Sequence, residues 1–311
     1  ISLGANTMTL SGGGSLNNTN ALVLSDPDSK LLLNSISLDS VSTTSDSLGL
    51  DVDADSTVTS LTVANITPVA IVSGSSLSGG ITLTAGSLNL SEAGTLASTI
   101  SMSGGVLDAD ESSTVSGALS HTADITIDVA ETKTLTYSGA AISLGANTLT
   151  LSGGGSLVSG GLTLNDPSSM LLLNSITVDS VSTTSYSLGL DVDADSTVTS
   201  LLVAHITPVS IANTKSLSGA ITLTAGSIKL NETGTLASTI SMSGGVLVAD
   251  ESLVVSGALT QTADITIDVA TGKTLSYTGA AVNLGAKSMT LSGGGTLIVC
   301  YTEQYQFPCI E

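Results

Sequence analysis

The sequence repeats itself over a long interval. The segment ISLGANTMTLSGGGSL at Ile1 returns as ISLGANTLTLSGGGSL at Ile142 and as VNLGAKSMTLSGGGTL at Val282. The repeating segment is therefore about 140 residues long. From Leu22 to Ala141, the first copy matches the second without a gap at roughly three quarters of positions. The fold must accommodate the same pattern of elements twice in succession.

A shorter and more degenerate motif recurs inside each copy. The segments LDVDADSTVT at Leu50, LNLSEAGTLA at Leu88 and LDADESSTVS at Leu107 align without gaps, and looser versions start at Ile1, Leu22 and Ile125. Their common form is a pair of alternating apolar residues, a short polar turn and a second alternating pair. Alternation with a period of two is typical of strands with one buried face. The turns contain Asp, Asn, Gly, Ser and Pro, which bend the backbone at little cost.

The spacing of this motif predicts an all-β fold, a β-solenoid (parallel β-helix). The motif recurs at intervals of roughly 17 to 27 residues, so about seven turns fit into each copy and about fifteen into the chain. Strands this short cannot each bury a face alone, whereas turns stacked about 4.8 Å apart bury it between them. A Greek-key sandwich also has short, regularly spaced strands, but it does not account for equivalent positions in every turn.

The long copies set the expected domain organisation. We expect repeat 1 at 1–141, repeat 2 at 142–281, and a partial third repeat with a C-terminal tail at 282–311. Because Ile1 already lies inside a repeat, we expect the sequence to be a piece of a longer product. The end of a solenoid needs a cap or a partner. The tail LIVCYTEQYQFPCIE suits a small cap or a joint to a next molecule, and a disordered terminus is the alternative.

Both cysteines, Cys300 and Cys309, lie in this tail. Their proximity makes them a candidate disulfide, which implies an oxidising compartment, with two free thiols as the alternative.

The amino-acid composition limits the kinds of partner that the chain can bind. The chain has six lysines, no arginine and 26 acidic residues, which gives a net charge of −20. Such a surface repels nucleic acid and anionic membranes. No apolar stretch approaches the roughly 18 residues of a membrane helix, so we expect no membrane insertion and assign the apolar content to short buried strands. The absence of Trp fits a thin aliphatic core.

The segment LGLDVDADSTVTSL starts at Leu48 and returns identically at Leu188, with aspartates at every second position. The candidate metal ligands are Asp51, Asp53, Asp55, Asp191, Asp193 and Asp195. Carboxylates and turn carbonyls suit Ca²⁺, but Ser56 stands where an EF-hand loop needs Gly, and no Glu follows at the twelfth position. We therefore expect no resident cofactor, and at most weak, nonspecific association of cations such as Ca²⁺. The alternative is that the charged turns only prevent sideways aggregation.

We expect the acidic residues to gather at one corner of successive turns. The residues assigned to that corner besides the six above are Asp26, Asp28, Glu92, Asp110, Glu111, Asp128 and Glu131 in repeat 1, and Asp250, Glu251 and Asp268 in repeat 2.

The sequence indicates no enzyme. His121 corresponds to Gln261 and His205 to Asn65, so neither histidine belongs to a site that the repeats share. Polysaccharide-cleaving sites need paired carboxylates and usually basic and aromatic side chains, and this chain lacks Arg and Trp. Ice binding is another alternative, because stacked Thr-x-Thr pairs form a flat array. The pairs are Thr7/Thr9, Thr57/Thr59, Thr134/Thr136 and Thr148/Thr150.

The tandem copies, with LTLSGGG and GGITLTAGSLNLSEAGTL phrases, resemble the repeat regions of large prokaryotic cell-surface β-solenoid proteins, such as filamentous haemagglutinin-like adhesins and surface fibre proteins. The resemblance is architectural and covers all but the tail. It implies export, a cell-surface or extracellular location in a prokaryote, and a role as a rod or stalk. We expect an extracellular fibre subunit that self-associates head to tail into a homopolymer. An adhesin that binds a surface glycan or cells is the alternative.

Overall fold

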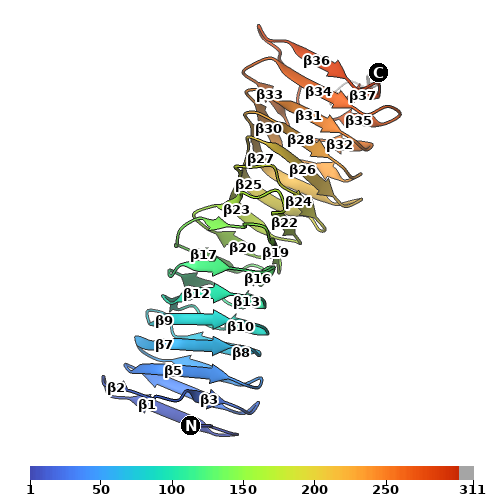
Figure 1. Cartoon of the computed structure of the whole chain (residues 1–311). Coiled ribbons are helices and arrows are strands. Elements are labelled where there is room, and N and C mark those ends of the chain that lie inside the picture. The colour runs from blue at the N-terminus through green and yellow to red at the C-terminus, as the bar shows by residue number, and fades with distance from the viewer. Residues whose placement is uncertain (301–311) are drawn as a thin grey trace. The chain divides into compact units, whose positions relative to one another are not determined.

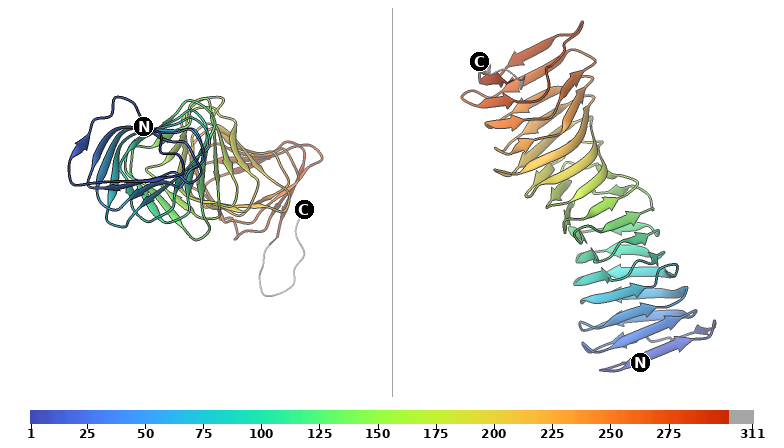
Figure 2. Two further views of the ribbon diagram at one scale, coloured as in Figure 1. Left: turned by 90° about the horizontal axis from the view of Figure 1, so that it is seen from below. Right: turned by 180° about the vertical axis from the view of Figure 1, so that it is seen from behind.

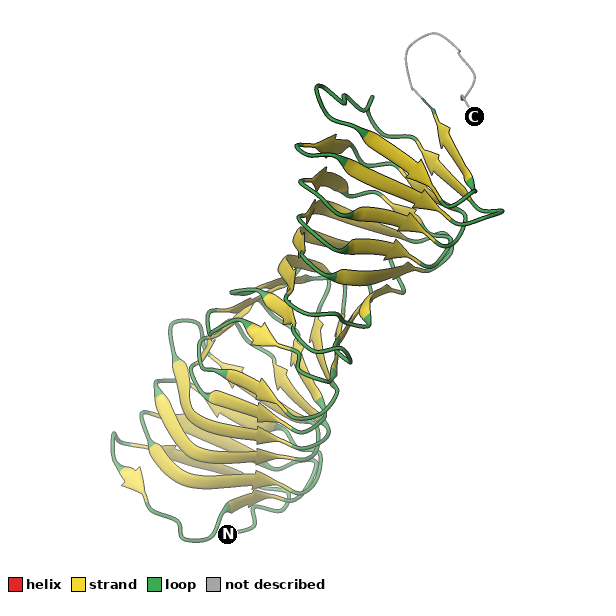
Figure 3. Cartoon of the chain, turned by 45° about the horizontal axis from the view of Figure 1, so that its top comes forward, coloured by secondary structure: helices red, strands yellow, loops and turns green. Residues whose placement is uncertain are grey.

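The computed structural model describes residues 1–300, and the regular elements in this range are all β-strands (Figure 1, Figure 3). The strands belong to two sheets and pair in parallel with strands of the neighbouring turns, as β4 does with β6 and β5 with β7. The chain is a β-solenoid of about fifteen turns, which confirms the predicted fold. Within residues 1–300 there is no helix with the length and apolarity to cross a membrane.

The chain divides into two compact units. Unit 1 comprises Ile1–Ile142 and Leu149–Gly160, and unit 2 comprises Ser143–Thr148 and the chain from Gly161 onward. Within each unit, successive turns lie one above another, as the blue to green turns of unit 1 do in Figure 2.

Each turn of unit 1 adds one strand to a first sheet. These strands are β1 (Thr7–Ser11), β4 (Lys30–Asn34), β6 (Gly49–Val52), β8 (Thr67–Ile71), β10 (Ser87–Leu90), β13 (Val106–Ala109), β16 (Ile125–Val129) and β19 (Thr148–Ser152). The second sheet contains β2 (Ser15–Leu16), β3 (Leu22–Leu24), β5 (Ser37–Thr43), β7 (Ser56–Val63), β9 (Ser76–Leu83), β11 (Thr95–Leu96), β12 (Thr99–Met102), β14 (Ser113–Val115), β15 (Leu119–His121), β17 (Thr134–Tyr137) and β20 (Ser156–Val158). Strand β18 (Ile142–Ser143) lies where the two units meet in the sequence.

Unit 2 has the same design. Its first sheet contains β22 (Met170–Leu173), β24 (Gly189–Val192), β26 (Ile206–Ile211), β28 (Ser227–Leu230), β31 (Val246–Ala249), β34 (Ile265–Val269) and β36 (Met289–Ser292). Its second sheet contains β21 (Leu162–Leu164), β23 (Thr177–Thr183), β25 (Ser196–Val203), β27 (Ser216–Leu223), β29 (Thr235–Leu236), β30 (Thr239–Met242), β32 (Leu253–Val255), β33 (Leu259–Gln261), β35 (Thr274–Tyr277) and β37 (Thr296–Val299).

The second sheet is bent, so one long strand in some turns corresponds to two short strands in others. Strand β9 pairs along its length with both β11 and β12. The bend in β9 is at Gly79, whose φ of 122° is unfavourable for other residues. A Cβ atom there would lie 1.8 Å from the carbonyl oxygen of Val58 in the preceding turn. Glycine is therefore required where the turn changes direction.

The core of each unit is a set of aliphatic ladders. One ladder of unit 1 runs through Leu31, Leu50, Val69 and Leu90, and its counterpart in unit 2 runs through Leu171, Leu190, Val209 and Leu230. All eight side chains are buried. Each residue packs on its equivalent in the next turn, so burial is shared between neighbouring turns. Medium-sized aliphatic side chains therefore recur at inward positions.

Candidate functional site

The aspartate-rich segment adopts the predicted strand–turn–strand conformation. Leu50, Val52 and Val58 are buried, and the turn between β6 and β7 exposes Asp53 and Asp55. The same geometry recurs in unit 2, where β24 leads into β25. The three aspartates of each segment therefore occupy different environments, although they are close in sequence.

Asp55 connects two turns of the solenoid. Its Oδ1 accepts hydrogen bonds from the backbone N–H of Ser76 at 2.8 Å and from the Ser76 hydroxyl at 3.0 Å. Asp195 makes the same two bonds to Ser216 at the same distances. A carboxylate that accepts bonds from the next turn stabilises the stack, so these two aspartates have a structural role.

Asp51 and Asp191 differ in their partners. Asp51 lies 2.8 Å from the Nζ atom of Lys30. Repeat 2 has Met170 in place of Lys30. The pKa of Asp191 is raised, mainly because burial disfavours its charged form, and further by the negative charges of Asp193 and Glu232.

The positions of the acidic side chains can be compared with what a metal site requires. Across residues 1–300, no three carboxylate, imidazole or thiol side chains form a group able to hold a metal ion. Weak cation association with the acidic surface stays a prediction.

The acidic residues lie at two corners, not one. The turns that lead from the first sheet to the second contain Asp53, Asp55, Glu92, Asp110, Glu111 and Glu131 in unit 1, and Asp193, Asp195, Glu232, Asp250 and Glu251 in unit 2. Asp26 and Asp28 lie between β3 and β4, in a turn that leads from the second sheet to the first. Their assignment to the same corner was wrong. A polar turn between two strands occurs at both corners of each coil of the solenoid, so this pattern does not identify the corner. Asp128 and Asp268 lie within first-sheet strands.

A carboxylate cluster that sequence reasoning missed lies on the outer face of the first sheet in unit 1. In the ladder, Asp108 pairs with Asn89 on one side and Asp128 on the other. The Asn89 amide donates to Asp108 Oδ2 at 3.1 Å and to Asp110 Oδ2 at 2.8 Å. Burial, followed by the charges of Asp110 and Asp128, raises the pKa of Asp108 to about 6. The signal was the shared outward position of Asn89, Asp108 and Asp128 in successive strands, with Asp110 in the turn that follows Asp108.

The Thr-x-Thr pairs do not stack into one array. Thr7/Thr9 and Thr148/Thr150 lie in the first sheet, on β1 and β19. The other two pairs, Thr57/Thr59 and Thr134/Thr136, lie in the second sheet, on β7 and β17. The partial threonine array considered for ice binding is therefore divided between the two sheets.

The two histidines occupy unrelated places. His121 ends β15, and its Nδ1 lies 3.1 Å from the carbonyl oxygen of Ala123. His205 lies in the turn before β26, where its ring contacts that of Tyr186.

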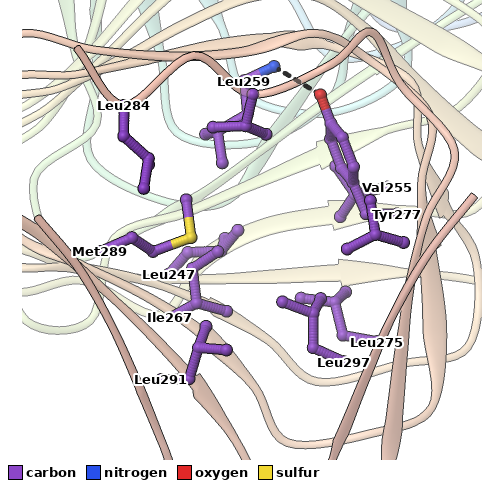
Figure 4. Close-up of a pocket in the computed structure, with 12 residues that line it drawn as sticks. Leu247, Val255, Leu259, Ile267, Leu275, Tyr277, Leu284, Met289, Leu291 and Leu297 are labelled. Carbon is purple, nitrogen blue, oxygen red and sulfur yellow. Dashed lines mark hydrogen bonds between the residues drawn. The ribbon is translucent and has the colours of Figure 1, made fainter. Parts of the chain in front are cut away.

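An apolar cavity of about 240 Å³ lies at the last turns of unit 2 (Figure 4). Its lining is almost entirely aliphatic: Leu247, Val255, Leu259, Ile267, Leu275, Tyr277, Val282, Leu284, Met289, Leu291, Leu297 and Val299. The Tyr277 hydroxyl accepts a hydrogen bond from the backbone N–H of Leu259 at 3.0 Å, drawn as the dashed line in Figure 4, and donates to the carbonyl oxygen of Ala280 at 2.6 Å. The polar atom of the tyrosine is thus satisfied, and the cavity offers apolar contact only.

This cavity is the interior of the solenoid where the stack of described turns ends. Leu291 is 57% exposed, whereas its counterpart Leu151 in the preceding copy is 0% exposed. Leu284 is 40% exposed and its counterpart Leu144 is 0% exposed. Equivalent core positions are therefore covered inside the chain and open in the last turn.

The predicted Cys300–Cys309 disulfide and the cap or joint formed by the tail lie at least partly outside the described residues, because the description ends at residue 300. Comparisons with protein-family models, curated proteins and solved structures each found no match to this chain.

Proposed function

We propose that the protein is a structural subunit of an extracellular or cell-surface fibre, and that its copies join head to tail. The observation that carries the proposal is the open apolar interior at Leu284 and Leu291, at the end of the described stack, whereas the counterparts Leu144 and Leu151 inside the chain are buried. Exposed apolar surface of this kind marks an interaction site.

The strand edges at both ends support the same joint. Among the described strands, β1 pairs only with β4, β36 only with β34, and β37 only with β35. The outer edges of β1, β36 and β37 thus have no partner among the described strands, and such an edge is a template for pairing with another strand.

The first and last described turns have similar sequences. Residues 1–16 and 282–297 both follow the pattern of alternating apolar residues around LGA and SGGG. A second copy therefore brings a turn with a similar pattern of apolar residues to the open end. Contact between two different surfaces of identical subunits does not close on itself, so it produces an open filament.

Charge favours contact at the ends over contact at the sides. Residues 1–16 contain no acidic or basic side chain, and residues 282–299 contain only Lys287. The chain as a whole has a net charge of −20. Two copies therefore repel each other sideways and approach end to end with the least repulsion.

The test is to place a charge in the open end. Leu291→Asp adds a carboxylate to an exposed position, so the fold tolerates it, but it prevents burial at the joint. The matched control is Leu48→Asp, at a site on the side of unit 1 that is 52% exposed. Light scattering across a concentration series and electron microscopy measure the assembly.

We expect wild-type protein and Leu48→Asp to form filaments and Leu291→Asp to stay monomeric. Filaments formed equally by all three proteins, or a wild-type protein that stays monomeric at high concentration, contradict the proposal.

A further inference from the structure

The turn that opens each copy of the long repeat has a recurring neighbour. We call it the leading turn, and its three copies are residues 1–16, 142–157 and 282–297. In the first two copies the chain continues into a second kind of turn, called the following turn, at residues 22–43 and 162–183. Residues 300–311 are unlike the start of a following turn in sequence. Within this chain, the third leading turn therefore does not have a following turn after it.

The first two leading turns hold their following turns by the same three hydrogen bonds. In repeat 1 the bonds run from the Leu3 N–H to the Val23 carbonyl oxygen at 2.9 Å, from the Gly4 N–H to the Ser25 hydroxyl at 3.4 Å, and from the Lys30 N–H to the Asn6 carbonyl oxygen at 3.1 Å. In repeat 2 the equivalent bonds run from the Leu144 N–H to the Thr163 carbonyl oxygen at 3.0 Å, from the Gly145 N–H to Asn165 Oδ1 at 2.9 Å, and from the Met170 N–H to the Asn147 carbonyl oxygen at 3.2 Å. The contact between these two kinds of turn is thus reproduced in both copies.

The third leading turn has the corresponding face open. Its Gly285 N–H, equivalent to that of Gly4, donates at 3.0 Å to Asn283 Oδ1 in the same loop. Leu284 is 40% exposed, whereas its equivalent Leu3 is 8% exposed. The Leu284 side chain lines the apolar cavity of Figure 4. The third leading turn therefore presents the face on which the other two bind a following turn.

Sequence differences between the copies favour the following turn of repeat 1 as the partner of this face. Lys287 occupies the position of Asn6 and Asn147 in the other leading turns. The following turn of repeat 1 has Asp28 where that of repeat 2 has Ser168. A basic residue therefore occurs in the leading turn that has no following turn, and an additional acidic residue occurs in the following turn of repeat 1.

The hydrogen bonds of repeat 1 place these two positions close together. The carbonyl oxygen of Asn6 accepts its bond from Lys30, which comes directly after the polar turn that contains Asp26 and Asp28. A residue in the place of Asn6 therefore lies beside this polar turn. Lys287 in that place has two carboxylates within reach of its long side chain, and opposite charges attract.

The other charges nearby do not cancel this attraction. Lys30 is engaged elsewhere, because its Nζ atom lies 2.8 Å from Asp51. Lys287 also acts on Asp264 in the preceding turn, whose pKa is lowered first by hydrogen bonds from Ser288 and also by the charge of Lys287. Lys287 would therefore lie between acidic residues on both sides.

We propose that the third leading turn of one copy stacks on residues 22–43 of the next copy, in place of that copy's own residues 1–16. The proposal rests on the head-to-tail assembly proposed above, and it specifies which surface of the next copy enters the joint. Residues 1–16 of the next copy are released when the joint forms.

The exchange is favoured by the order of the incoming turn. Residues 1–16 have one covered face, and Ile1 is 64% exposed whereas its equivalent Ile142 is 1% exposed. An end turn of this kind opens at little cost, and its release recovers conformational entropy. Residues 282–297 are already ordered, because β36 pairs with β34 and β37 with β35. A preorganised segment binds without paying that entropy again.

Hydrogen–deuterium exchange of wild-type monomers and filaments, followed by mass spectrometry of peptides, tests the proposal. We expect the amides of residues 282–297 to exchange at least about tenfold more slowly in filaments, and those of residues 7–11 at least about tenfold faster. If both segments exchange more slowly, the intact end turns stack on each other. That result overturns the exchange and leaves head-to-tail assembly standing, whereas a chain that forms no filaments overturns both.

A matched pair of neutral substitutions gives opposite results if the exchange occurs. Leu3→Ser weakens the attachment of residues 1–16, and Leu284→Ser removes the equivalent apolar contact from the incoming turn. We expect Leu3→Ser to lower the concentration needed for filaments and Leu284→Ser to raise it, each about tenfold. Circular dichroism checks that the remaining turns stay folded. Loss of filaments in Leu3→Ser overturns the proposal, because it makes residues 1–16 part of the joint.

A charge exchange tests the contact of Lys287. We expect Lys287→Glu to raise the concentration needed for filaments about two- to fivefold, and the double variant Lys287→Glu/Asp28→Lys to restore it. The control Lys215→Glu, before β27, changes the net charge equally and is expected to have a smaller effect. A double variant that assembles no better than Lys287→Glu alone contradicts the placement of Lys287 beside Asp28.

Discussion

At the residue scale, aspartates with the same spacing in sequence have different physical roles. Asp55 accepts two hydrogen bonds from Ser76 in the next turn, whereas Asp51 forms an ion pair with Lys30. Asp108 lies between other carboxylates and has a raised pKa. Position in the ladder, and not spacing along the chain, determines what each carboxylate does.

The raised pKa of Asp108 makes the stability of unit 1 depend on pH. The folded state binds the Asp108 proton more tightly than the unfolded state, for which the pKa is 3.8. Stability therefore falls as the pH rises from about 4 through about 6, and the cost is fully present at pH 7.

Asp108→Val, which copies repeat 2, removes this cost. Allowing for the partial exposure of the carboxylate, we expect the variant to be more stable than wild type by about 1–2 kcal/mol at pH 7. The difference shrinks towards pH 4. Thermal unfolding of both proteins at the two pH values measures it, and an advantage of the same size at both contradicts the role of the proton.

At the element scale, some of the glycines at which the chain bends cannot be replaced, because the neighbouring turn leaves no room for a side chain. Gly49 begins β6 with a φ of 78°, and a Cβ atom there would lie 1.8 Å from the carbonyl oxygen of Pro68. Gly74 has a similar φ of 89°, but nothing lies within 4 Å of its Cβ position. Repeat 2 places Thr214 there with a φ of 66°.

We expect Gly49→Ala to destabilise unit 1 by at least about 3 kcal/mol, because the backbone of two turns must separate. Gly74→Thr copies repeat 2 and costs about 1 kcal/mol or less. Urea unfolding followed by circular dichroism compares the two variants. Equal losses for both substitutions show that backbone conformation, and not contact between turns, sets the cost.

The sequence predicts the elements better than it predicts their placement. Alternation identifies Leu50, Val52 and Val58 as buried, and the structure agrees. The alternation does not distinguish the two corners of a solenoid coil, because at each corner a strand is followed by a polar turn and another strand. Asp26 and the Thr-x-Thr pairs were misplaced for this reason. The Asp108 cluster depends on register between turns, which appears only when the strands are paired.

At the scale of the whole molecule, the proposed fibre depends on a contrast between acidic sides and neutral, apolar ends. The two copies keep the same aliphatic ladders, and their end turns share one sequence. Differences in the core are conservative, as at Leu38/Val178 and Leu88/Ile228, whereas larger changes occur at outer positions, such as Asp46/Tyr186 and Asp108/Val248. Repetition thus preserves the stack and leaves the outer faces free to differ.

Salt should promote assembly. Raising sodium chloride from about 50 mM to about 500 mM screens the repulsion between chains of charge −20, while the apolar joint is not weakened. We expect the concentration needed for filaments to fall, as measured by light scattering. Dissociation of filaments by salt points instead to a joint made of ion pairs.

The most direct test of head-to-tail assembly is X-ray diffraction from aligned filaments. If copies join at their end turns, the spacing between strands of about 4.8 Å runs along the filament, and its reflection lies on the meridian. A 4.8 Å reflection on the equator means that copies associate through their sides, and it contradicts the account.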